Sequence, residues 1–71
     1  MLTFYEVLQT CNNDLNVVAF LIAYFSNETN INKIVKNLEV SKINSYEMEI
    51  NKILDLKLHT IKDLVKVHYD R

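Results

Sequence analysis

The stretch that decides the fold is the run LNVVAFLIAYF at residues 15–25. Its apolar residues do not alternate with polar ones, as in a half-buried strand, and an isolated strand would need partner strands that this chain lacks. A helix that is apolar on nearly every side must be buried over most of its surface. We therefore expect residues 15–25 to form the central helix of the fold, or a helix that partly faces another chain.

The segment before this run predicts a capped N-terminal helix. Thr3 and Glu6 have the spacing of a capping box, in which each residue's side chain accepts a backbone N–H of the other. Residues 12–14 should end the helix, because Asn tolerates the left-handed conformation and Asp14 can cap the next helix. One apolar face follows at helical spacing, formed by Phe4, Val7, Leu8 and Cys11.

The polar residues 26–30 predict a connector, and further helices are expected after it. The next helix has an apolar stripe at Ile31, Ile34, Val35 and Leu38. Another helix starts at Ser41 or Asn44, with its inward stripe at Ile43, Tyr46, Ile50, Ile53 and Leu54. Residues 56–59 predict a tight connector with two buried leucines and with His59 in the loop, before a last helix that opens at Thr60. The inward residues of that helix are Ile61, Leu64 and Val65.

Together these patterns predict an all-α fold. It is a compact bundle of four to five short helices around the central apolar helix at residues 15–25, in a single helical domain over residues 1–71. Neighbouring helices should cross by ridges-into-grooves packing.

The composition excludes several classes of protein. The 71 residues include no Gly, no Pro and one Cys, with 8 Lys+Arg against 9 Asp+Glu. Without Gly there is no phosphate-cradling loop and no dinucleotide fingerprint, and a lone Cys11 forms no internal disulfide. The longest apolar run, residues 17–25, has nine residues, whereas a membrane span needs about 20. We expect a soluble, cytoplasmic protein, and its many Asn, Ile and Lys residues indicate an AT-rich phage, plasmid, viral or low-GC bacterial genome.

No residue set predicts catalysis or metal binding. Nine residues separate His59 from His68, which places them on opposite sides of any shared helix at about 3.6 residues per turn. Cys11 lies on an apolar face without a nearby cation, which favours a buried structural thiol over a nucleophile. Glu47 and Glu49 point away from each other on a helix. We therefore expect no enzyme activity, no metal and no cofactor.

One segment has a motif-like pattern, the stretch IVKNLEVS at residues 34–41. Leu38, Val40 and Ser41 match the turn of the helix-turn-helix of bacterial and phage regulators, which this segment resembles. Glu39 stands where that family has Gly. The resemblance implies a DNA-binding transcriptional regulator that uses residues 31–54. Its DNA contacts would come from Lys33, Lys36, Lys42, Asn44 and Lys52.

The prediction that the residues favour is a small, non-enzymatic protein-interaction or regulatory module. It would act as a homodimer or by binding a partner protein, because so short a chain has little surface with which to bury its apolar helix. DNA binding is the alternative, and it is not favoured since two glutamates and no arginine occupy the expected recognition helix. The interface candidates are Val17, Phe20, Leu21, Tyr24 and Phe25.

Overall fold

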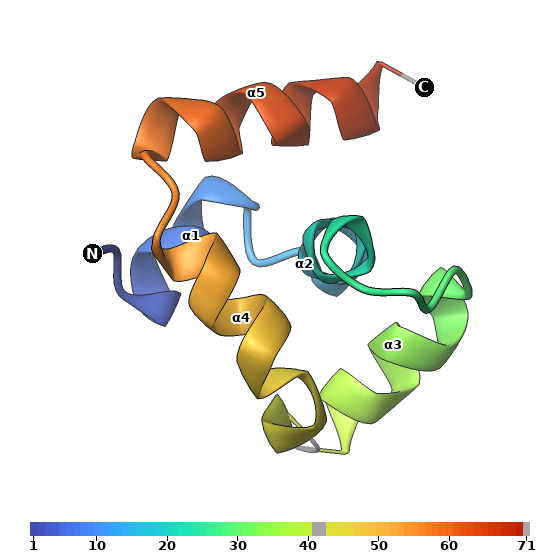
Figure 1. Cartoon of the computed structure of the whole chain (residues 1–71). Helices are drawn as coiled ribbons and strands as arrows, with labels where there is room; N and C mark the ends of the chain where they lie inside the picture. Colours follow the sequence, from blue (N-terminus) through green and yellow to red (C-terminus); the bar gives the residue numbers. More distant parts are fainter. Residues whose placement is uncertain (41–42, 71) are drawn as a thin grey trace.

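The second helix lies at the centre of the fold, with the other helices around it (Figure 1). This computed structural model describes residues 1–40 and 43–70, and within them every regular element is helical. The all-α bundle around a central apolar helix is therefore confirmed. In chain order the elements are α1 (Phe4–Thr10), α2 (Leu15–Tyr24), α3 (Ile31–Glu39), the 3₁₀ helix η1 (Ile43–Tyr46), α4 (Glu47–Leu54) and α5 (Leu58–Tyr69).

The core is built on α2. This helix packs against α3, α4 and α5, while α1 packs against α5. Half of the α2 residues are buried, namely Val17, Val18, Ala19, Leu21 and Ile22. They meet Val7 of α1, Ile34 of α3 and Ile61 of α5, which are also buried. Their burial contributes the main favourable free energy of a fold this small.

The capping box at the start of α1 is confirmed. The backbone N–H of Glu6 donates to Thr3 Oγ1 (3.2 Å), and the Thr3 N–H donates to Glu6 Oε1 (2.9 Å). The Thr3 hydroxyl also donates to Glu6 Oε1 (3.1 Å). The two bonds that the Glu6 carboxylate accepts, from the Thr3 N–H and the Thr3 hydroxyl, lower its pKa. The Leu2 N–H donates to the Leu54 carbonyl (3.0 Å), so the segment before α1 is also held to the end of α4.

The turn between α1 and α2 also forms as the residues predict. Asn12 and Asn13 both have φ near 58°, in the left-handed region that Asn tolerates better than most residues. Asp14 then caps α2, because its side chain accepts the N–H of Asn16 (2.9 Å). Two positive-φ residues in succession let a chain without Gly reverse direction in a short turn.

The start of α4 differs from both predicted positions. Asn44 lies inside η1, α4 begins only at Glu47, and Ser41 lies outside the described residues. The N-cap of α4 is Tyr46, whose side chain makes no capping bond. Its hydroxyl instead accepts a bond from Asn37 Nδ2 (2.8 Å), which ties η1 to α3. The predicted inward stripe is confirmed at Tyr46, Ile50 and Ile53, which are buried.

The last connector is shorter than predicted. The helix α5 begins at Leu58 after an extended Lys57, whose carbonyl accepts the N–H groups of Thr60 and Ile61. The expectation of two buried leucines in a loop is wrong for Leu58, which lies in the helix and is 37% exposed. His59 is likewise in the first turn of α5 and exposed rather than in a loop. Ile61 and Val65 are buried as predicted.

Candidate protein-binding surface

One side of α2 is only partly covered by the rest of the described chain. We call Asn16, Phe20, Ala23 and Tyr24 the α2 stripe, since they share this side at helical spacing. Asn16 and Tyr24 are exposed, and Phe20 and Ala23 are half-buried. No residue of α2 is charged, although exposed sides of surface helices are normally charged or polar. The α2 stripe is therefore an uncharged, largely apolar surface on an otherwise buried helix.

Aromatic side chains of α5 extend this surface. The rings of Phe20 and His68 lie 5.0 Å apart at 52°, and those of His68 and Tyr69 lie 5.4 Å apart at 74°. These distances are typical of favourable aromatic contacts. Tyr24 is 63% exposed and Tyr69 is 51% exposed. The C-terminal turn of α5 thus adds a second exposed tyrosine beside the α2 stripe.

A hollow of about 270 Å³ lies next to Tyr24, and we call it the α2–α3 hollow. The one carboxylate among its lining residues, that of Glu28, already has partners within the chain. Glu28 accepts the backbone N–H of Asn30 (3.0 Å) and pairs with Lys33 Nζ (3.3 Å), and these interactions lower its pKa. The surface of the hollow that a partner could contact is therefore mainly apolar. It is lined by Phe20, Ala23, Tyr24, Glu28, Thr29 and Ile31.

The predicted interface residues fall on two different sides of α2. Val17 and Leu21 are completely buried in this chain's own core, so they have no surface to offer a partner in this conformation. Tyr24 is exposed and Phe20 is half-buried on the α2 stripe. Phe25, half-buried after the helix end, contacts Tyr24 edge-on at 5.3 Å. Burial of Val17 and Leu21 follows from helical spacing, because the side on which they lie faces the neighbouring helices.

The sequence analysis missed four residues of this surface. Asn16 and Ala23 share the open side of α2 with Phe20 and Tyr24, and a helical projection of residues 15–24 could have grouped them. His68 and Tyr69 could not have been assigned in this way. Their position depends on how α5 crosses α2, for which no local sequence signal exists.

The described residues among those proposed for DNA contact lie on three different elements. Lys33 and Lys36 lie on α3, and Lys33 is paired with Glu28. Asn44 lies on η1 and Lys52 on α4, both exposed, while Lys42 is outside the described residues. The first turn of α4 between them carries two acidic side chains, those of Glu47 and Glu49.

The described residues form neither a cluster of potential metal ligands nor a membrane-spanning helix. Residues 1–40 and 43–70 contain no group of three or more His, Cys, Asp or Glu side chains placed to hold a metal ion. None of their helices is long and apolar enough to cross a bilayer. Cys11 is free and fully buried, and burial raises the pKa of its thiol to about 11.

Comparison with known proteins adds no relative to this picture. No protein-family model matches the chain, and neither does any curated protein or any solved structure. The surface itself therefore carries the functional interpretation.

Proposed function

We propose that this chain is a non-enzymatic protein-interaction module that forms a homodimer through the α2 stripe. The observation that carries the proposal is the uncharged open side of a helix that is otherwise core. Contiguous apolar surface on a small soluble domain marks an interaction site. Exposed tyrosines, which combine a large apolar ring with a polar hydroxyl, are enriched where such surfaces bind.

The shape of this surface supports self-association in particular. A twofold dimer interface must be self-complementary, because the same patch occurs on both subunits. Here a projecting ring, Tyr24, stands directly beside the α2–α3 hollow that it helps to line. Around a twofold axis, each protomer's Tyr24 would enter its partner's hollow. The small side chain of Ala23 between the aromatic residues would let the two α2 helices approach closely.

The size of the chain sets how much surface such a dimer must bury. Stable interfaces bury roughly 800 Å² per partner, which is about one sixth of the 4776 Å² that this chain exposes. The four residues of the α2 stripe do not supply that area alone. We therefore include His68 and Tyr69 of α5 in the proposed interface, since His68 contacts Phe20 directly.

Solution mass tests the proposal. By size-exclusion chromatography with light scattering, we expect the wild-type chain to be a dimer and Tyr24→Glu to be a monomer, because a buried, unpaired carboxylate is costly. Tyr5→Glu is the matched control, since Tyr5 is 69% exposed on α1 and lies outside the α2 stripe. Circular dichroism should give equal helix content for all three proteins. A wild-type monomer at about 1 mM would contradict self-association.

DNA binding by residues 31–54 stays the alternative, and the bond from Asn37 to Tyr46 is the observation that favours it. This bond fixes the relative placement of two consecutive helical segments, which a helix-turn-helix also needs. Charge weighs against it. Phosphate contacts need free Lys or Arg, whereas Lys33 is paired and Glu47 and Glu49 stand on the first turn of α4. Salt-sensitive binding to duplex DNA that Lys36→Glu abolishes would put this function first.

A further inference from the structure

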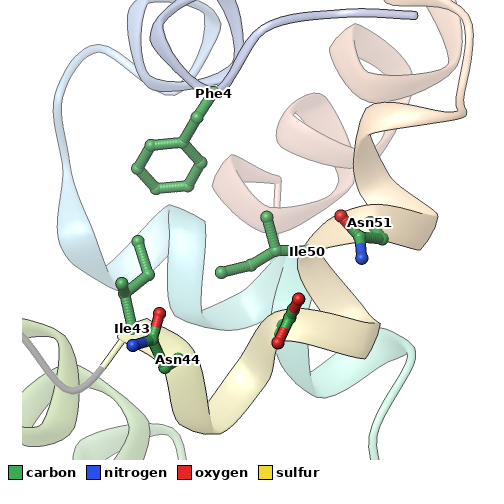
Figure 2. Close-up of a pocket in the computed structure, with 6 residues that line it drawn as sticks. Phe4, Ile43, Asn44, Ile50 and Asn51 are labelled. Atoms are coloured by element: carbon green, nitrogen blue, oxygen red, sulfur yellow. The ribbon is translucent and has the colours of Figure 1, made fainter.

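A second hollow, of about 250 Å³, lies between α1 and the η1–α4 segment, and we call it the α1–α4 hollow (Figure 2). It shares no lining residue with the α2–α3 hollow. Its floor is apolar. Phe4 extends from α1 towards the space between Ile43 and Ile50, which come from η1 and α4. Ile50 is buried, and Phe4 and Ile43 are half-buried.

The rim of the α1–α4 hollow is polar and comes from one side of the η1–α4 segment. Asn44 and Glu47 are three residues apart, the repeat of a 3₁₀ helix, and Glu47 and Asn51 are four apart, one α-helical turn. The three side chains therefore stand on one side of the segment, and all three line the hollow.

The charge of this rim has no ion-pair partner among the described residues. Glu47 is the charged residue among those that line the hollow, and it is exposed. The structure gives its carboxylate no hydrogen bond or ion pair with the described part of the chain, in contrast to Glu28, which pairs with Lys33. A free carboxylate at the edge of an apolar floor complements a ligand that joins an apolar group to a cation.

We propose that the α1–α4 hollow binds a peptide segment of a partner protein in which a large apolar side chain lies next to Lys or Arg. The apolar side chain would occupy the floor against Phe4, and its cationic neighbour would pair with Glu47. The carboxamides of Asn44 and Asn51 each offer donors and an acceptor, which suits the N–H and C=O groups of a peptide backbone. The volume is just below the roughly 300–1,000 Å³ of a drug-sized ligand site, so it suits a single side chain.

Titration with capped dipeptides, followed by ¹⁵N NMR of the full chain, tests this site. We expect the amide signals around Phe4 and residues 43–51 to shift, and the affinity to fall in the order acetyl-Phe-Lys-amide, acetyl-Phe-Gln-amide, acetyl-Phe-Glu-amide. Glu47→Gln should weaken binding of the Lys peptide about two- to fivefold, the range of an exposed ion pair. It should leave the Gln peptide unaffected.

The control is Glu49→Gln, which changes the same turn of α4 at a residue that does not line the hollow. It should leave the affinity for the Lys peptide unchanged, as should Tyr24→Glu on the α2 stripe. Equal affinity for the three peptides, or equal weakening by Glu47→Gln and Glu49→Gln, would overturn the proposal. Phenethylammonium that binds as tightly as the Lys peptide would also overturn it, because a simple amine would then be the ligand.

Discussion

At the scale of single residues, Cys11 is the group whose chemistry the fold changes most. Its side chain is fully buried among apolar neighbours, where desolvation, with the nearby Asp14 carboxylate, raises the thiol pKa from 9.0 to about 11. Only the thiolate is a nucleophile. A change of this size lowers the thiolate fraction at pH 8 by a factor of about 100 relative to the unfolded chain. Cys11 is thus an inert part of the core, as the sequence predicts.

This raised pKa predicts how stability depends on pH. The folded chain holds the thiol proton more tightly than the unfolded chain does. The protonated thiol therefore contributes about 2–3 kcal/mol to the free energy of unfolding. This contribution is fully present below pH 9 and is lost as the pH rises from 9 to about 11. Urea unfolding at several pH values measures it. Cys11→Ala removes the thiol and should flatten that part of the profile. Equal slopes for the two proteins between pH 9 and 11 would contradict the burial of the thiol.

Residue-scale features were predictable where the signal was local. Thr3, Asn12, Asn13 and Asp14 act through side-chain or backbone bonds to residues a few positions away, so spacing alone identified their roles. Leu58 was assigned wrongly because nothing local distinguishes a buried leucine in a connector from a partly exposed one in a first helical turn. Its exposure depends on where α5 lies against α1 and α2.

At the scale of elements, the bond between Asn37 and Tyr46 ties the residue before α4 to α3. Tyr46 is 7% exposed, and its hydroxyl accepts the Asn37 amide across the junction of α3 and η1. The sequence predicted a helix start at Ser41, which lies outside the described residues, or at Asn44, which lies inside η1. The inward position of Tyr46 was predictable from spacing, but its bond to Asn37 was not, since that contact depends on how η1 lies against α3. The polar rim of the α1–α4 hollow lies on the same segment, and that Phe4 of α1 faces it is again a tertiary effect.

A double-mutant cycle measures this bond. We expect Tyr46→Phe, which keeps the ring and removes the hydroxyl, to lower the free energy of unfolding by about 1 kcal/mol, the usual net value of a hydrogen bond. Asn37→Ala should cost a similar amount, and the double variant should cost less than the sum, with a coupling of about 1 kcal/mol. Chemical unfolding in urea provides the values. Strict additivity of the two changes would show that the bond contributes nothing to the junction.

At the scale of the whole molecule, the chain is as compact as its length allows. Its radius of gyration is 11.0 Å, equal to the roughly 11 Å expected for a folded chain of this size. The central position of residues 15–25 was predictable because an all-round apolar helix has few other places to lie. Which of its sides stays open was harder to predict, because Asn16 alone marks one side of this apolar helix and the rest depends on how the neighbouring helices pack. The packing of α3, α4 and α5 selected Phe20 and Tyr24 for the surface and Val17 and Leu21 for the core.

A domain this small has a modest core, so a dimer interface on the α2 stripe should contribute measurably to its stability. We expect the midpoint of thermal unfolding to rise with protein concentration, by about 5 °C or more between 10 μM and 1 mM, because dissociation accompanies unfolding. Tyr24→Glu should abolish this dependence, and Tyr5→Glu should retain it. Salt between about 50 and 500 mM should change it little, since the α2 stripe carries no charge. If the midpoint of thermal unfolding does not depend on the concentration of the wild-type chain, the folded unit is the monomer and the proposed dimer is wrong.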